Sequence, residues 1–162
     1  MGLYASDLFG AATVTMADST IGPHAYAAVW LDGDGIYDLT GNTLYGGAGI
    51  AFGDTFLHGN ALFAQGGVSA WNGVTGLRLV QNTFQDAAEI AVFLHDASAT
   101  LDQNVWANNG LSLRQQRCAD VPEVIGDDLL GLDVELCPPE NRLIAYDFGL
   151  TTLYLPEIET DE

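Results

Sequence analysis

The tripeptides Asn42-Thr43-Leu44, Asn60-Ala61-Leu62, Asn82-Thr83-Phe84 and Asn104-Val105-Trp106 follow one rule, an asparagine with a large apolar residue two positions later. They stand 18, 22 and 22 residues apart, and Ser19-Thr20-Ile21 fits the rule 23 residues before the first of them. A period near twenty residues means that one short unit is rebuilt along the chain, each copy burying its apolar side on its neighbours. The repeat therefore predicts about five stacked coils.

Short strands explain the residues around each asparagine. Before it, two inward positions flank an outward one, in the pairs Val14/Met16, Tyr37/Leu39, Thr55/Leu57, Leu77/Leu79 and Ala99/Leu101. After it, period-two alternation continues to Ile21, Leu44, Leu62, Phe84 or Trp106. A third strand is expected at an apolar triplet that follows, namely Ala27-Ala28-Val29, Ile50-Ala51-Phe52, Val68-Ser69-Ala70, Ile90-Ala91-Val92 and Leu111-Ser112-Leu113. Each coil is thus expected to hold three short strands.

Two other folds compete with this interpretation. A helix is disfavoured because Gly, Asn and Asp break every apolar run before a helical turn could repeat. An antiparallel sandwich also has regularly spaced short strands and stays open. It gives no reason for one residue type to return to one position, whereas stacked coils place the four asparagines in a hydrogen-bonded ladder. We expect an all-β solenoid over residues 1–117 and a C-terminal cap over residues 118–162.

These residues resemble those of the right-handed parallel β-helix superfamily, which includes pectate-lyase-like and parallel β-helix repeat proteins. The resemblance covers about two thirds of the chain and rests on an asparagine at a tight turn with an aliphatic interior. It implies a right-handed parallel β-helix. Members include polysaccharide lyases, hydrolases, epimerases, adhesins and proteins without known activity, so the resemblance assigns no chemistry.

The charge is strongly negative. The 162 residues include 22 acidic side chains and only four basic ones, all arginine, for a net charge of −18. Such a surface repels nucleic-acid phosphate and anionic lipid, so no nucleic-acid partner is expected. We find neither a membrane-spanning stretch nor a signal peptide, and membrane insertion is not expected. Residues 156–162 form an acidic tail.

Cys118 and Cys137 are the two cysteines of the chain, and we expect them to form a disulfide that ties down the cap. Two free thiols are the alternative. A disulfide implies an extracellular, cell-surface or periplasmic location. Residues 142–148 and 150–155 are expected to form cap strands. Residues 3–13 begin in the middle of a coil, which indicates a piece of a longer solenoid or a protein that associates end to end or side by side.

An outward position of the strand before each asparagine carries the candidate catalytic groups. It holds Thr15, Asp38, Phe56, Arg78 and Thr100 in successive coils. Pectate-lyase-like enzymes place calcium ligands and a catalytic arginine on such a face, and Arg78, Asp38 and Asp102 resemble that equipment. Glycoside hydrolysis needs two nearby carboxyls, which Asp86 with Glu89 or Asp96 with Asp102 could supply.

The segment Asp32-Gly33-Asp34-Gly35-Ile36-Tyr37-Asp38 is a candidate calcium loop, with Asp32, Asp34 and Asp38 as ligands. It matches an EF-type loop only in part, because Ile36 stands where an oxygen ligand would be needed and Thr43 where a closing glutamate would. A Gly/Asp turn between two coils is the alternative.

Aromatic side chains mark two candidate glycan-binding surfaces. Trp30, Trp71 and Phe93 are expected in one column beside a flat column of small residues, namely Ala28, Ala51, Ser69, Ala91 and Ser112. Tyr45 and Phe63 are expected in adjacent coils. Such rings can stack on sugar rings. Burial under a turn or the C-terminal segment is the alternative.

A strong scaffold signal with weak catalytic signals favours a secreted or surface-displayed, non-catalytic solenoid with a structural or recognition role in a larger or self-associating assembly. The alternatives are a polysaccharide lyase or hydrolase, in which Arg78 and Asp38 would act, and a carbohydrate-binding protein.

Overall fold

The computed structural model describes residues 2–6, 13–23, 27–51, 53–63, 67–71, 74, 76–116, 123–129 and 131–134, and for residues 6 and 132–134 the backbone alone. Eighteen strands and no helix occur in these residues. The described part of the chain has no helix of the length and hydropathy needed to cross a membrane.

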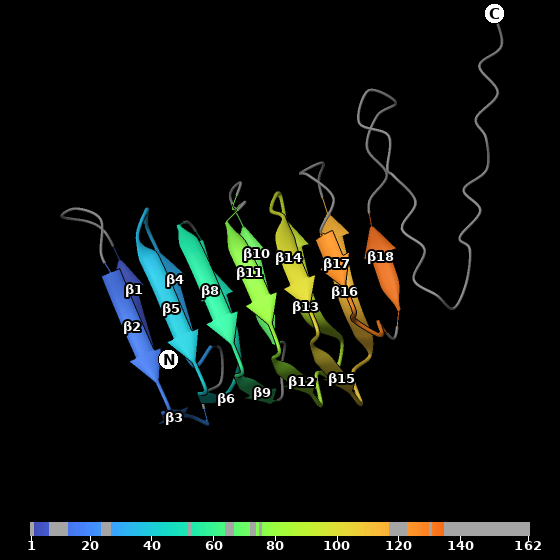
Figure 1. Cartoon of the computed structure of the whole chain (residues 1–162), viewed down its shortest axis with the longest axis horizontal. Helices are drawn as coiled ribbons and strands as arrows, with labels where there is room; N and C mark the ends of the chain where they lie inside the picture. The colour runs from blue at the N-terminus through green and yellow to red at the C-terminus, as the bar shows by residue number, and fades with distance from the viewer. Residues whose placement is uncertain are drawn as a thin grey trace, which may run out of the picture.

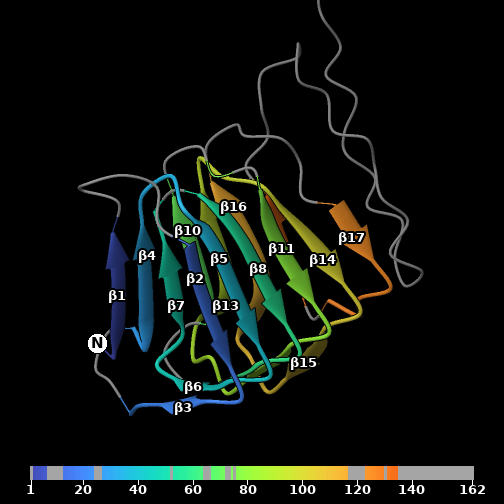
Figure 2. The same cartoon turned by 60° about the vertical axis from the view of Figure 1, so that its left-hand side comes forward.

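The strands form three sheets that run along the solenoid (Figures 1 and 2). Sheet A contains β1 (Leu3–Ser6), β4 (Val29–Asp32), β7 (Ala48–Ile50), β10 (Val68–Trp71), β13 (Ile90–His95), β16 (Leu111–Gln116) and β18 (Leu132–Val134). Sheet B contains β2 (Thr13–Ala17), β5 (Ile36–Thr40), β8 (Asp54–His58), β11 (Leu77–Val80), β14 (Ala99–Asp102) and β17 (Glu123–Ile125). Sheet C contains β3 (Thr20–Ile21), β6 (Thr43–Tyr45), β9 (Ala61–Phe63), β12 (Thr83–Gln85) and β15 (Val105–Ala107).

Every strand pairing among the described residues is parallel and joins one coil to the next. This confirms an all-β parallel solenoid of about five coils and removes the antiparallel sandwich. Strands β17 and β18 extend sheets B and A beyond residue 117, where we expected a cap to begin.

The interior consists of stacked apolar columns. In sheet B, Leu57 lies in register with Leu79, and Leu79 with Leu101; all three are fully buried. In sheet C, Phe84 stacks on Trp106 with ring centroids 4.6 Å apart. The same inward positions of the first coil, Val14, Met16 and Ile21, are only half-buried. The core is therefore closed in the central coils and open to solvent at the first.

Asparagine side chains form a buried ladder between sheets B and C. Asn60 donates from its backbone N and its Nδ2 to Oδ1 of Asn82, at 2.9 and 3.0 Å, and Asn82 donates in the same way to Asn104. Each Nδ2 also reaches a backbone carbonyl of the preceding coil, as Asn82 does to Leu57 at 2.8 Å. At the first coil, the backbone N of Ser19 donates to Oδ1 of Asn42. Ser19, which the repeat spacing aligns with the asparagines, is therefore part of the ladder. The asparagines thus hold one turn of successive coils in register.

Asp127 is the last member of this ladder among the described residues, and the asparagine repeat did not predict it. Its Oδ1 accepts hydrogen bonds from the backbone N of Asn104 at 2.9 Å and from Nε1 of Trp106 at 2.8 Å. The signal was present in the sequence, because Asp127 follows Asn104 by 23 residues and comes after a glycine, as Asn42 and Asn60 do. Burial raises the pKa of the Asp127 carboxyl above its usual value, against the hydrogen bonds from Trp106 and Asn104, which lower it.

The substitution Asp127→Asn is expected to increase the free energy of unfolding at neutral pH by about 1 kcal/mol. Since the folded pKa is raised, this carboxyl favours the folded state most below its unfolded pKa, and that stability is lost as pH rises through the folded pKa. The amide carries no charge, keeps an oxygen for Asn104 and Trp106, and adds a donor. Urea unfolding at mildly acidic and neutral pH measures the difference.

The matched control is Asp128→Asn, which makes the same charge change at the exposed neighbouring residue. If both variants change stability equally at both pH values, the gain reflects net charge, and the assigned role of Asp127 is wrong.

Candidate functional site

Among the residues that the structure describes, the outer face of sheet A carries the largest group of aromatic side chains on one surface. One outward column holds Tyr4, Trp30, Gly49, Ser69, Phe93 and Arg114 in successive coils. The next outward position of the strands holds Trp71, His95 and Gln116. Parallel strands lie about 4.8 Å apart, so Trp30 and Phe93, three strands apart, are separated by about 14 Å along the solenoid.

Trp30 and Trp71 stack on each other. Their ring centroids are 5.3 Å apart and their planes differ by 27°. Gly49 makes this contact possible, because a Cβ added there would lie 2.6 Å from the Trp30 ring. The absent side chain lets the ring of Trp30 lie over the intervening coil and reach Trp71. Both indoles are half-buried, which leaves part of the stacked pair open to solvent.

The predicted columns of sheet A need two corrections. Trp30 and Phe93 share a column, as expected, but Trp71 lies in the neighbouring outward one. The column of small residues does not exist as proposed: Ala28, Ala91 and Ser112 are fully buried, while Ser69 points outward in the Trp30 column. These three small residues therefore form no exposed surface beside the aromatic rings.

A shallow groove lies farther along the same face, over β10, β13 and β16. It has a volume of about 530 Å³ and is lined by Ser69, Ala88, Glu89, Ile90, Phe93, Arg114 and Gln116. Three of these residues, Ser69, Phe93 and Arg114, belong to the Trp30 column. The groove and the tryptophan pair thus form one continuous surface.

The second aromatic pair lies on sheet C. Tyr45 and Phe63 are in register in adjacent coils, as expected, and stack with centroids 5.2 Å apart. Gln85 and Ala107 continue their column. Because no further aromatic ring follows in the described part of this column, the pair forms a smaller apolar platform than sheet A offers.

The candidate catalytic residues lie on the outer face of sheet B. Asp38, Phe56 and Arg78 occupy one column in the predicted order, followed by Thr100 and Glu123. The Arg78 guanidinium lies over the Phe56 ring, 4.8 Å from its centroid, and Oγ1 of Thr40 donates a hydrogen bond of 2.9 Å to Asp38. Phe56 therefore separates the arginine from the carboxylate, as its position in the sequence suggested.

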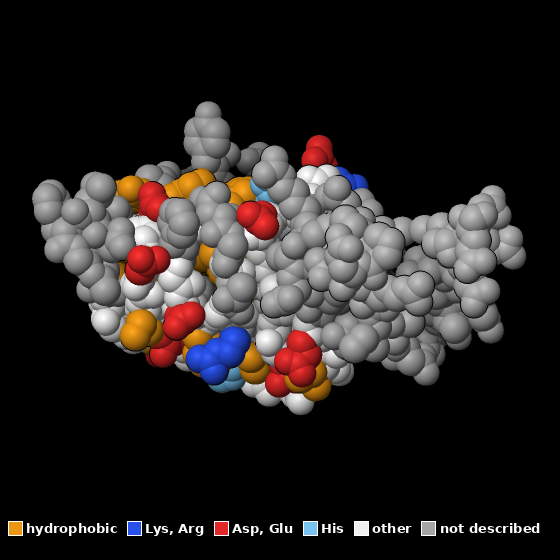
Figure 3. Space-filling model, turned by 90° about the horizontal axis from the view of Figure 1, so that it is seen from above, with side chains coloured by type: hydrophobic (Ala, Val, Ile, Leu, Met, Phe, Trp, Pro, Cys, Tyr) orange, Lys and Arg blue, Asp and Glu red, His pale blue; other side chains and the backbone are white. Residues whose placement is uncertain are grey.

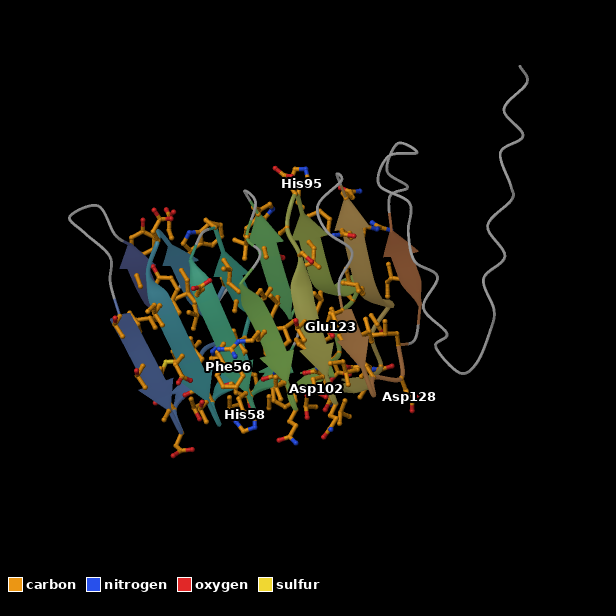
Figure 4. The ribbon with its side chains drawn as sticks, turned by 45° about the horizontal axis from the view of Figure 1, so that its top comes forward. Phe56, His58, His95, Asp102, Glu123 and Asp128 are labelled. Carbon is orange, nitrogen blue, oxygen red and sulfur yellow. The ribbon has the colours of Figure 1, made fainter. Side chains whose placement is uncertain are left out.

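Asp102 lies in the neighbouring column of sheet B, two coils beyond His58 (Figure 4). Its Oδ1 is buried without a hydrogen-bond partner. Figure 4 also shows His95 at the opposite edge of the solenoid, away from Phe56, His58 and Asp102. In the first carboxyl pair proposed for hydrolysis, Asp86 accepts hydrogen bonds from Gln85 and Asn108. In the second pair, Asp96 follows β13 of sheet A, whereas Asp102 ends β14 of sheet B.

The calcium-loop residues divide between two strands and the turn that joins them. Asp32 ends β4, Asp34 lies in the turn, and Asp38 is in β5. Among the residues that the structure describes, no three His, Cys, Asp or Glu side chains are grouped as ligands of one metal ion.

Several further predictions fall outside the described residues. They are the pairing of Cys118 with Cys137, the cap strands over residues 142–148 and 150–155, and the acidic tail. Comparison with known proteins gave no match to any family model, to any curated protein or to any solved structure.

Proposed function

We propose that this chain is a secreted or surface-displayed, non-catalytic β-solenoid that binds a polysaccharide along the outer face of sheet A. The observation that supports this most is the half-exposed stack of Trp30 on Trp71 over Gly49. Indole rings supply a large apolar surface at a small entropic cost, and sugar rings present C–H faces that fit it. The proposal includes a right-handed β-helix related to the pectate-lyase-like proteins, with a disulfide between Cys118 and Cys137.

The extent of the face supports a chain-like ligand. Tyr4, Trp30 and Phe93 recur along one column, and Tyr4 is 51% exposed. A row of rings along the solenoid axis can contact several units of one polymer, so weak contacts add up. The net charge of −18 disfavours polyanionic glycans at long range. A neutral polysaccharide is therefore the ligand class that we propose.

We further propose that the solenoid works within a larger or self-associating assembly. Within the described residues, β1, β2 and β3 each pair on one side only, and the larger inward residues of this coil are half-buried, namely Leu3, Val14, Met16 and Ile21. Open strand edges pair readily with further strands. The mass of the protein in solution, compared with that of one chain, tests this part.

The test of the binding proposal is affinity electrophoresis in gels that contain a soluble neutral glucan or mannan. Trp71→Ala is expected to weaken retention about tenfold, because it removes one ring of the stack. The matched control is Phe63→Ala, which removes one ring of the other stacked pair, on sheet C. Retention lost equally in both variants, or in neither, contradicts the assignment of sheet A.

Polysaccharide cleavage is the rival, with Arg78 as base and Asp38 as cation ligand or electrostatic partner. We expect no unsaturated products and no new reducing ends when the protein is incubated with neutral or acidic polysaccharides and Ca²⁺. Turnover that Arg78→Ala abolishes would replace the binding proposal by a catalytic one.

A further inference from the structure

The groove at the β13–β16 end of sheet A contains charged groups of both signs. Glu89 is exposed on the loop that enters β13, and Arg114 is half-buried in β16. The ring of Phe93, the hydroxyl of Ser69 and the amide of Gln116 also line the groove. A neutral sugar suits this set, since its hydroxyls can donate to a carboxylate and accept from a guanidinium while its ring packs on the aromatic face.

The wall of the groove is fixed by the following coil. The backbone N of Leu111 donates to the carbonyl of Glu89 at 2.7 Å, and that of Gly110 donates to Ala87 at 2.9 Å. A Cβ added at Gly110 would lie 2.6 Å from the Glu89 carbonyl, so the close approach of the two coils requires glycine. Asn109 adds two more bonds, accepting from the backbone N of Ala87 and donating to the carbonyl of Phe84. A wall held in this way need not be ordered by a ligand.

The placement of Arg114 is informative because basic groups are scarce. The described residues contain only two Lys or Arg side chains, Arg78 and Arg114, and Figure 3 shows basic side chains at two separate places among acidic and apolar ones. Arg78 lies on the Phe56 ring of sheet B. Arg114 lines the groove and also interacts with another part of the protein.

We propose that this groove is a subsite for a single neutral pyranose unit, with Phe93 as the platform and Glu89, Arg114 and Gln116 as the hydrogen-bonding groups. This inference rests on the proposed polysaccharide binding and names the part of the face that selects the sugar. Glu89 and the surrounding negative charge disfavour an anionic sugar. Selection of a neutral over an anionic unit therefore comes from the carboxylate that lines the groove and from the negative net charge.

The test uses a neutral trisaccharide from the polysaccharide that the protein retains, and its form with one carboxylate. Isothermal titration is expected to show binding of the neutral form at least about fivefold tighter than that of the carboxylate form. Glu89→Gln is expected to weaken the neutral form about tenfold and to reduce the discrimination against the carboxylate. Gln116→Ala, which removes an exposed side chain, is expected to weaken the neutral form by about threefold.

The control for charge is Asp96→Asn, an exposed acid that follows β13 and does not line the groove. If Glu89→Gln behaves like Asp96→Asn, or if the carboxylate form of the trisaccharide binds as well as the neutral form, the subsite is wrong. Failure here is distinct from failure of the polysaccharide proposal. If retention depends on Trp71 but not on Glu89, only the subsite proposal is contradicted. If trisaccharide binding depends on Glu89 but not on Trp71, the groove is supported and the assignment of the tryptophan pair as a binding platform is contradicted.

Discussion

Replacing Asn82 by alanine is expected to lower the free energy of unfolding by about 3–5 kcal/mol. The variant leaves the backbone N of Asn60 and one of its two Nδ2 hydrogens without an acceptor, while the bond from Nδ2 to Leu39 remains. The carbonyl of Leu57 loses the donor that Asn82 supplies. These groups are buried, so water cannot replace the lost bonds without opening the turn. Each unsatisfied buried group costs about 1–3 kcal/mol. Urea unfolding followed by circular dichroism measures the change.

Gln81→Ala is the control for this prediction. Gln81 precedes Asn82 in the same turn and is the residue of that turn with a positive φ, 52°. Its side chain forms hydrogen bonds with His58 and Gln103 at the surface. We expect its loss to change stability by about 0.5 kcal/mol or less. Equal effects of the two substitutions would mean that the ladder contributes no more than surface contacts.

Leu79→Ala is expected to cost about 2–5 kcal/mol, because it opens a cavity between two fully buried leucines of the neighbouring coils. Leu57, Leu79 and Leu101 stack in register, so no side chain from a loop can move in to fill the space without shifting a strand. Thermal and urea unfolding of the variant give the loss.

Met16→Ala tests the same column at the first coil, where the side chain is half-buried. A loss of about 1 kcal/mol is expected there, since less apolar surface returns to water. The contrast between the two positions is the diagnostic result. A Met16→Ala loss as large as that of Leu79→Ala would show that the first coil is covered in solution.

The sequence was most informative where the turn has constant length. The link between sheets B and C is always one residue with positive φ followed by the asparagine position, as at Gln81-Asn82 and Gln103-Asn104. Alignment on that position therefore placed Asp38, Phe56 and Arg78 correctly in one column of sheet B. It also placed Tyr45 next to Phe63 on sheet C.

Sheet A was harder to predict because the links that lead into it differ in length. Residues in register there are 19, 20, 24 and 21 positions apart between Val29, Ala48, Val68, Val92 and Leu113. Triplets chosen by apolar pattern alone were thus displaced by up to two residues. A shift of two residues keeps the alternation of faces. Ala28 was expected in the middle of a strand, but it precedes β4 and is buried there.

The stack of Trp30 on Trp71 depends on a residue without a side chain. The repeat spacing predicts which residues share a column. Whether the ring of Trp30 reaches Trp71 depends on the side chain in the coil between them, and Gly49 has none. Asp127 was missed for a different reason: the repeat was defined by asparagine, and a buried aspartate fills the same position by accepting hydrogen bonds from Asn104 and Trp106.

The binding face can be tested most directly by titrating a neutral oligosaccharide into the ¹⁵N-labelled protein and following the indole N–H signals of its three tryptophans. Trp106 is buried and donates its indole N–H to Asp127, so it reports on the interior. The signals of Trp30 and Trp71 should shift with ligand concentration while that of Trp106 stays in place. Shifts confined to amides of sheets B or C, or unchanged Trp30 and Trp71 signals under conditions where the polysaccharide retains the protein, would contradict binding on sheet A.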